Sequence, residues 1–333
     1  MLTVGDRSQA FQSLNTGARL KTDLNRYSNE LSSGKPADVA KHLSGRTAAV
    51  AGLDRDIERI DGFLDRATAL DLTLDRQQLA LASITETLED SGLRMIVVRS
   101  DTTLSQLETA EKLGEDAFGS AIERLNGFSA GRSLFSGVAT DRVPLASAQT
   151  ILDALEIEVA GLTEAGDIAT AVRDWFADPV GGFSAVAYQG ATGDAAKHRI
   201  SEIHSIDGTA RADAPEVRSA LAASATAALS ARLSGTIGHA ERADLLKGAG
   251  TDAFSAAQGL HGLAARIGDD QALIANERVR LGAQRTMFAS ARNDRVNLDP
   301  FESASRLQEA QQSLELHFTA TARLSRLSLA NYL

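Results

Sequence analysis

The sequence predicts a mainly α-helical protein, an elongated antiparallel bundle of long coiled-coil helices built from both ends of the chain. Three observations support this prediction. Apolar residues recur every seven positions in two long stretches, a spacing that strands and loops do not produce. Aromatic residues make up only 5% of the chain, as suits close packing of helices. Finally, the two ends mirror each other, and between them we expect a small mixed α/β domain.

The composition excludes several classes of function. The chain has 333 residues and a formal net charge of −10, so a phosphate backbone would be repelled and nucleic-acid binding is not expected. The absence of cysteine excludes disulfides, thiolate metal sites and cysteine nucleophiles. No window is apolar enough to span a membrane, and the amino terminus lacks the basic and apolar regions of a cleavable signal peptide. We expect no cofactor, no metal and no enzymatic activity.

The first predicted helix covers residues 11–31 and has a thin apolar stripe. Leu14, Leu24 and Leu31 belong to that stripe, which is too narrow to stabilise an isolated helix. Gly34 and Pro36 follow it, since glycine is favoured just past a helix end and proline cannot continue a helix. The sequence therefore predicts a helix that needs a partner and a defined break after it.

A much longer helix is predicted over residues 43–98. Gly92 lies near its far end and is a candidate weak point, because glycine costs about 1 kcal/mol relative to alanine inside a helix. A third helix follows, with apolar residues from Leu104 to Phe128, an expected end near Gly131 and Asp101 as its expected cap. The longest apolar row contains one residue in every seven: Leu53, Ile60, Ala67, Leu74, Leu81, Leu88 and Met95.

The middle of the chain lacks the long period. Two short helices are predicted over residues 151–162 and 168–175, and strands over residues 183–188 and 198–206. Pro215 is well placed to begin another helix, because its missing N–H is not needed in the first turn. This section is the predicted α/β insertion.

The heptad period returns with Leu260 and ends at a break over residues 297–300. A last helix then carries a thin stripe, as the first helix does, so both termini are expected at the same end of the molecule. The predicted domains are terminal helices (1–40 and 299–333), a long-helix bundle (41–137 and 236–298) and the insertion (138–235). The last stripe includes Leu307, Leu314, Phe318, Leu324 and Leu327.

Three segments carry a resemblance to a known family. Residues 30–35, Glu-Leu-Ser-Ser-Gly-Lys, resemble the break after the terminal helix of flagellins, and residues 280–284, Arg-Leu-Gly-Ala-Gln, resemble the flagellin carboxyl-terminal region. Residues 131–137, Gly-Arg-Ser-Leu-Phe-Ser-Gly, are similar to the turn with which junction proteins leave their helical domain. The chain thus resembles the flagellin superfamily of bacterial flagellar axial proteins and, within it, the hook–filament junction proteins of the hook-associated protein 3 type. The resemblance covers roughly residues 1–140 and 250–333.

The resemblance implies a structural component of the bacterial flagellum that joins the hook to the filament. It implies terminal helices that are poorly ordered in the monomer and become ordered as copies polymerise into a tube. It also implies export through the flagellar type III apparatus without a cleavable signal, an extracellular location, and an export chaperone. The other implied partners are further copies of the chain, a hook-associated protein on the hook side and flagellin on the filament side.

Specific residues are implied for these roles. The expected assembly interface is the set of stripe residues Leu14, Leu24, Leu31, Leu307, Leu314, Phe318, Leu324 and Leu327. The expected helix break and insertion boundary are Gly34, Pro36, Gly131, Arg132, Phe135 and Gly137.

Two other functions fit the same patterns. A flagellin that forms the filament itself would share the terminal segments, although the turn at 131–137 favours a junction protein. A cytoplasmic coiled-coil scaffold or signalling protein would use the same heptads without leaving the cell. His198, Glu202 and His204 could face the same side of a strand and bind a metal, but a solvated strand face explains them better.

Overall fold

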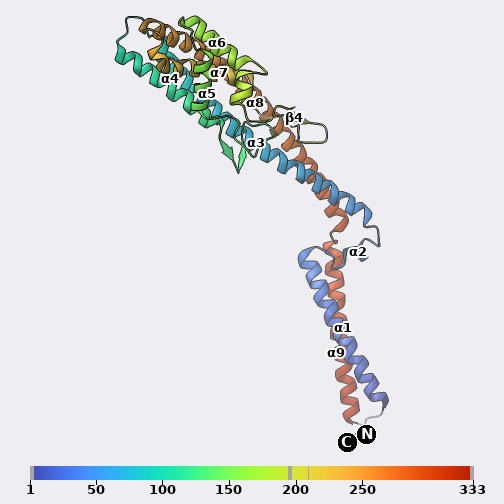
Figure 1. Ribbon diagram of the computed structural model, residues 1–333. Helices are drawn as coiled ribbons and strands as arrows, with labels where there is room; N and C mark the ends of the chain where they lie inside the picture. The colour runs from blue at the N-terminus through green and yellow to red at the C-terminus, as the bar shows by residue number, and fades with distance from the viewer. Residues whose placement is uncertain (1–3, 194–196, 209, 331–333) are drawn as a thin grey trace. The chain divides into compact units, whose positions relative to one another are not determined.

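The computed structural model describes residues 4–193, 197–208 and 210–330, and it confirms the mainly α-helical fold (Figure 1). The chain divides into two compact units. Unit 1 comprises Met1–Asp61 and Leu281–Leu333, and unit 2 comprises Gly62–Arg280. The helices are α1 (Val4–Ser33), α2 (Val39–His42), α3 (Ala48–Ile96), α4 (Leu104–Leu125), α5 (Ala148–Glu158), α6 (Ala165–Ala177), α7 (Pro215–Arg232), α8 (His239–Val296) and α9 (Pro300–Ala330).

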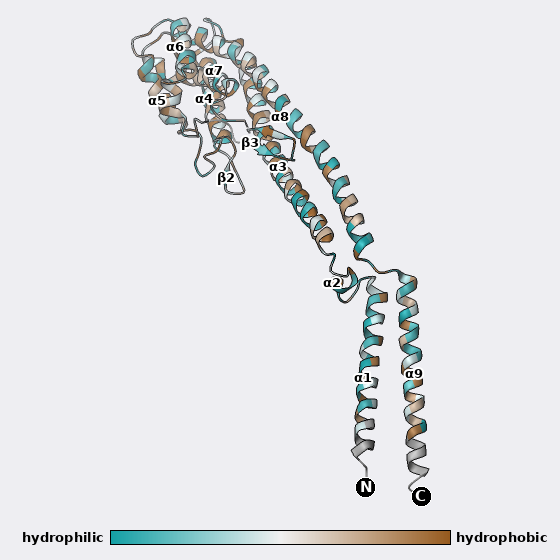
Figure 2. Cartoon of the chain, turned by 90° about the vertical axis from the view of Figure 1, so that its right-hand side faces the viewer, coloured by the Kyte–Doolittle hydropathy of each residue, from teal (hydrophilic) through white to brown (hydrophobic). Residues whose placement is uncertain are grey.

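In unit 1 the helices α1 and α9 run side by side in opposite directions (Figures 1 and 2). Near one end of the pair the hydroxyl groups of Ser13 and Thr321 lie 3.3 Å apart. At the other end the backbone N–H of Leu298 donates to the carbonyl of Gly34 over 3.0 Å. The start of α1 and the end of α9 therefore lie together, as the mirrored ends of the sequence predict.

The break after α1 is confirmed, but the long helix begins later than expected. Gly34 has φ +67°, the left-handed conformation that ends α1. The chain then forms the single turn α2, in which Asp38 caps by accepting from the backbone N–H of Lys41 over 3.0 Å. Ser44 and Gly45 have φ of 51° and 78°, values that a right-handed helix excludes. For this reason α3 begins at Ala48 and not at Leu43.

The heptad rows of α3 and α8 form the core, as predicted. In unit 2 the α3 residues Ala67, Leu74, Leu81, Leu88 and Met95 are buried. On α8 the row Leu260, Ile267 and Ile274 is buried in the same unit. In unit 1 ion pairs join the two helices, Arg292 to Asp54 and Arg285 to Asp61, each over 2.5 Å.

Gly92 is a packing residue and not a weak point. A Cβ at Gly92 would lie 3.1 Å from the carbonyl oxygen of Gly250 and 3.3 Å from the Ala253 Cβ. A Cβ at Gly250 would lie 2.9 Å from both the Gly92 carbonyl oxygen and the Ile96 nitrogen. The two glycines let α3 and α8 approach closely. The tight packing that results compensates for the low helix propensity of glycine.

The predicted short helices of the middle section are confirmed as α5 and α6, and Pro215 begins α7. The predicted cap at Asp101 is wrong, because α4 starts after Thr103, whose N–H and hydroxyl both donate to Gln106 Oε1 over 3.2 and 2.8 Å. The predicted strand over 183–188 is also wrong. Phe183 and Ala187 are both fully buried, a spacing of four that suits a helical turn, and Phe183–Ala187 forms the π-helical turn η1.

Strands occur only as short hairpins in the part of the chain that the structure describes. β1 (Phe128–Ser129) pairs antiparallel with β2 (Arg132–Ser133), and β3 (Lys197–Arg199) pairs antiparallel with β4 (Ser205–Asp207). The predicted strand region over 198–206 is thus a hairpin. Its residues Ile200 and Ile206 are buried in the main core of unit 2.

Candidate assembly surfaces

The α1–α9 pair buries few of its side chains. Among the side chains that the structure describes in these two helices, Ser303 and Ala310 alone are buried. The predicted stripe residues of this pair, Leu24, Leu31, Leu307 and Leu314, are half-buried. Full burial of one leucine contributes about 1.5–3 kcal/mol, so a seam without buried leucines stabilises the pair weakly.

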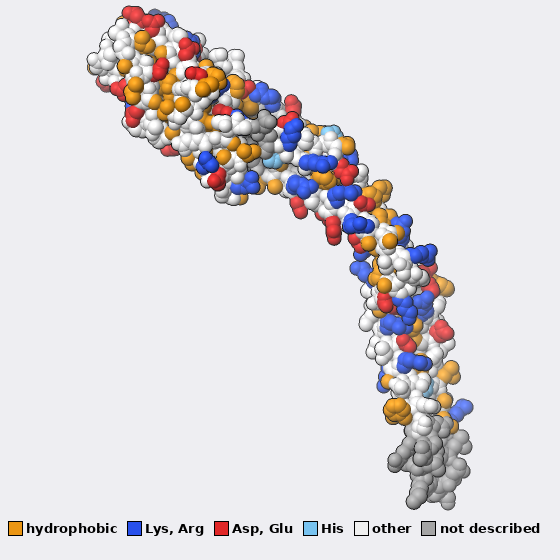
Figure 3. Space-filling view, turned by 45° about the vertical axis from the view of Figure 1, so that its right-hand side comes forward, with side chains coloured by type: hydrophobic (Ala, Val, Ile, Leu, Met, Phe, Trp, Pro, Cys, Tyr) orange, Lys and Arg blue, Asp and Glu red, His pale blue; other side chains and the backbone are white. Residues whose placement is uncertain are grey.

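The half of the pair nearest the chain ends has polar residues inside and apolar residues outside. Between the helices lie Ser13 with Thr321, and Gly17, where a Cβ would lie 3.2 Å from His317 Nε2. We call the outward-facing apolar residues of this half the distal apolar surface, and Figure 3 shows hydrophobic side chains standing at the surface of this unit. Its members and their exposed fractions are Phe11 (70%), Leu14 (74%), Leu316 (70%), Phe318 (51%) and Leu324 (54%).

The predicted interface residues therefore fall into two groups. Leu14, Phe318 and Leu324 lie on the distal apolar surface, whereas the four half-buried leucines contribute to the seam of the pair. The ammonium group of Lys21 lies 5.8 Å from the centre of the Phe318 ring, and Phe318 remains 51% exposed. Leu327 lies outside the residues whose side chains the structure describes. Phe11 and Leu316 were not predicted, because neither belongs to a heptad stripe.

The residues of the helix break position the chain after α1. The Gly34 N–H donates to the Glu30 carbonyl over 2.9 Å, and the Gly34 carbonyl accepts from Leu298. The Glu30 carboxylate accepts from the Ala37 N–H over 3.0 Å, and Pro36 between them is half-buried. The break thus connects the end of α1 to the segment that precedes α9.

The predicted insertion boundary is the β1–β2 hairpin and the chain that follows it. Ala130 and Gly131 form the turn with φ of 49° and 76°, the positive values of a type I′ hairpin. Arg132 is exposed, whereas Phe135 is fully buried in the main core of unit 2. Gly137 has φ +66°, and a Cβ there would lie 3.2 Å from Arg211 Cδ. The two glycines therefore permit the turns on either side of the anchoring phenylalanine.

Gln77 holds this boundary to α3, and sequence reasoning missed it. Its side chain is fully buried, and Nε2 donates to the carbonyls of Leu134 over 2.5 Å and Ala210 over 2.9 Å. Each carbonyl would otherwise be a buried acceptor without a helix or strand partner. Gln77, which stands beside Gln78 midway between the heptad positions Leu74 and Leu81, is the sequence signal that could have indicated it.

A second buried polar cluster joins three helices of unit 2. Glu111 on α4 accepts from the Ser230 hydroxyl of α7 over 2.7 Å and from Arg242 Nε of α8 over 2.8 Å. The second carboxylate oxygen accepts from Arg242 Nη2, so the pair is bidentate. The Glu111 carboxylate raises the pKa of the Arg242 guanidinium, and the arginine is charged throughout the working pH range.

The residues considered for a metal do not come together. His204 pairs with Glu277 over 2.9 Å, and Arg280 Nη2 also binds Glu277 over 2.6 Å. Burial, with a smaller effect of Arg132, lowers the pKa of His198, which lies on β3. Over the ranges 4–193, 197–208 and 210–330, no three His, Asp or Glu side chains are grouped as a metal site requires.

No family model matches the chain, and no curated protein matches it. Two solved structures show a partial likeness to this chain. A flagellar hook-associated protein from Vibrio parahaemolyticus has a TM-score of 0.49 and 14% sequence identity, over 74% of this chain and 95% of that chain. FlgL of Bacillus cereus has a TM-score of 0.49 and 10% identity, over 74% of this chain and 99% of that chain.

Within the described residues no helix combines the length and the apolar character that crossing a bilayer requires.

Proposed function

We propose that this chain is a structural component of the bacterial flagellum that joins the hook to the filament. In this proposal copies of the chain polymerise as their terminal helices become fully packed against one another. Support comes from the flagellin-like segments at 30–35 and 280–284 and from the junction-type turn at 131–137. The left-handed conformations of Gly34, Gly131 and Gly137 agree with turns at these places.

The distal apolar surface is the observation that carries the proposal. The large apolar side chains of this surface remain 51–74% exposed although the two helices are paired. In the single chain they therefore do not contribute the stabilisation that their burial would give. Burying each leucine or phenylalanine against a neighbouring copy would contribute about 1.5–3 kcal/mol. That gain would also order a helix pair whose own seam is weak.

The proposed partners follow from the same role. They are other copies of the chain, a hook-associated protein on the hook side, flagellin on the filament side, and an export chaperone. The proposed location is the extracellular flagellum. No catalytic step belongs to the proposal.

Two exposed residues of the distal apolar surface provide the test. The double variant Leu14→Ser/Phe318→Ser should be exported and helical, but should not support filament growth in a strain whose own gene is deleted. The matched control is Ile157→Ser/Val180→Ser, which removes apolar side chains that are 78% and 83% exposed in unit 2. Electron microscopy of flagella and a motility assay provide the measurement. Normal filaments from the Leu14/Phe318 variant would refute the role of this surface.

A second experiment separates the alternative functions. A junction protein should be scarce in sheared flagella, whereas a filament-forming flagellin should be the main protein there, and a quantitative gel measures the difference. A cytoplasmic scaffold should remain in the cells. Appearance of the protein in the culture medium of a strain without filaments would therefore exclude the scaffold.

A further inference from the structure

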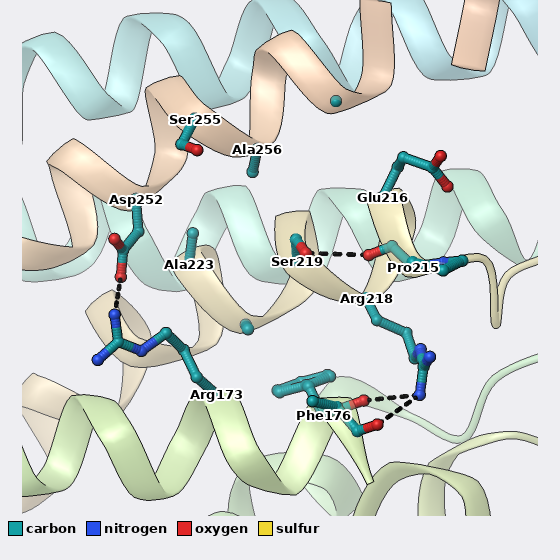
Figure 4. A pocket seen from close by; sticks show the side chains of 13 residues that line it. Arg173, Phe176, Pro215, Glu216, Arg218, Ser219, Ala223, Asp252, Ser255 and Ala256 are labelled. Carbon is teal, nitrogen blue, oxygen red and sulfur yellow. Dashed lines mark hydrogen bonds and ion pairs between the residues drawn. The ribbon is translucent and has the colours of Figure 1, made fainter. Parts of the chain in front are cut away.

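Unit 2 has a groove between α6, α7 and α8 that nothing in the described chain fills (Figure 4). Its volume is about 540 Å³. Part of its lining is apolar and consists of Ala222, Ala223 and Ala256. Other lining residues have a small side chain or none, namely Ser219, Ser255 and Gly259. We call it the α6–α8 groove. Because its lining residues are small, the groove has room for bulky apolar side chains of another molecule.

The ends and the side of the groove are charged. Arg173 of α6 faces Asp252 of α8 with 3.8 Å between nitrogen and oxygen, a loose pair with 53% and 36% of the two side chains exposed. Arg218 donates from Nη1 to the carbonyls of Phe176 and Ala177 over 3.1 Å, so its charge also stays at the groove. Arg173 is therefore the cation most available to an incoming carboxylate.

A different face of unit 2 presents an apolar ridge. Leu72, Leu79 and Leu93 of α3 are 50%, 64% and 59% exposed. They lie on one heptad row, in which the exposed Glu86 stands between Leu79 and Leu93. This row lies on the opposite side of α3 from the buried core row. Within the described chain these three leucines remain at least half exposed. We call the four residues the α3 ridge.

The groove and the ridge match in length and in charge. Two residues seven apart on a helix are about 10.5 Å apart, and the groove follows α7 over residues 215–223, a span of about 12 Å. The groove can therefore receive Leu72 and Leu79 together. With Leu72 at the Gly259 end, the next ridge residue, Glu86, extends past the Asp252 end toward Arg173.

We propose that the α3 ridge of one copy docks into the α6–α8 groove of the next copy. The contact is heterologous, since two different surfaces meet, and such contacts repeat from copy to copy into rings or helical arrays. This inference goes beyond the proposed function because it lies in unit 2 and requires no contact of the terminal helices. It identifies a lateral or longitudinal contact that the wall of a tube would need.

The absence of cysteine makes cross-linking a direct test. The full-length chain with both Leu79→Cys and Ser255→Cys should give, under mild oxidation at high concentration, a ladder of disulfide-linked dimers, trimers and larger species on a non-reducing gel. Chains with one cysteine each should give only dimers, and only when the two are mixed. The control pair Ile157→Cys with Ser255→Cys replaces Leu79 by a position outside the ridge that is even more exposed, 78% against 64%.

Charge reversal then tests the predicted orientation. Glu86→Arg should reduce the cross-linking rate several-fold, and adding Arg173→Glu should restore it. A ladder no stronger than that of the control pair would overturn the proposal. Dimers from Leu79→Cys alone would also overturn it, since they would show that the ridge pairs with itself. Because Leu14→Ser/Phe318→Ser leaves both unit 2 surfaces intact, a persistent ladder in that background separates this proposal from the role of the terminal helices.

Discussion

At the scale of single residues, the buried Glu111–Arg242 pair shows how unit 2 tolerates charge in its core. The Arg242 and Glu111 side chains are 9% and 3% exposed, and each oxygen of the carboxylate accepts at least one hydrogen bond. Removing one partner of such a pair leaves an uncompensated buried charge. The pair therefore specifies how α4 and α8 align, whatever its net contribution to stability.

We expect Glu111→Ala to lower the free energy of unfolding by about 3–5 kcal/mol, because it leaves Arg242 buried without a counter-ion. The replacement of both by leucine should cost much less, since no charge then remains in the core. Urea unfolding followed by circular dichroism measures both. Lys112→Ala, at an exposed neighbouring position, is the control and should leave the free energy of unfolding almost unchanged. Equal losses for the single and the double variant would contradict this reasoning.

The Glu277 cluster predicts a dependence on pH. Hydrogen bonds from Arg280, opposed by burial, lower the pKa of Glu277 below its usual value of 4.5. A carboxyl with a lowered pKa in the folded state stabilises the fold above its unfolded pKa and loses that contribution as the pH falls through the folded pKa. We expect Glu277→Gln to cost about 1–3 kcal/mol at neutral pH, and the difference from the natural chain to shrink below about pH 4. A difference that stays constant from neutral to acid pH would show that the charge of Glu277 is irrelevant.

At the scale of elements, the crossing of α3 and α8 depends on paired glycines. A Cβ at Gly250 would meet backbone atoms of α3 at 2.9 Å, whereas a Cβ at Gly248, two residues earlier on α8, would meet nothing within 4 Å. Backbone cannot move aside as a flexible side chain can. Two glycines on one helix thus offer a matched comparison.

We expect Gly250→Ala to destabilise the protein by about 1–3 kcal/mol, since α3 must shift to avoid the new methyl group. Gly248→Ala should stabilise it by about 0.5–1 kcal/mol through helix propensity alone. Thermal unfolding of both variants gives the comparison. Stabilisation by both substitutions would mean that the close approach of Gly92 and Gly250 does not limit packing.

At the scale of the whole molecule, the two units differ in how much apolar surface each buries. Most of α7 is buried, whereas the described part of α1 has no buried side chain. Local opening is easiest where few side chains are buried. The terminal pair should therefore open far more often than the helices of unit 2.

Amide hydrogen exchange tests this difference in the full-length chain. We expect amides of α1 and α9 to exchange with little protection and those of α4 and α7 to exchange only through the largest openings. Assembly through the distal apolar surface should then raise the protection of α1 and α9 selectively. Terminal helices already as protected as α7 in the monomer would contradict the proposed coupling of ordering to polymerisation.

Periodicity by itself determined the helical class, the long helices of the core, the breaks near Gly34 and Pro300, and the antiparallel placement of the two ends. These features are set by local spacing and by residues that end helices, so one chain read in order contains them. Tertiary structure decided the rest. It placed Gln77, Glu111 and the Gly92–Gly250 contact, and it turned Leu14 and Phe318 outward, because each depends on which residues from distant parts of the chain become neighbours.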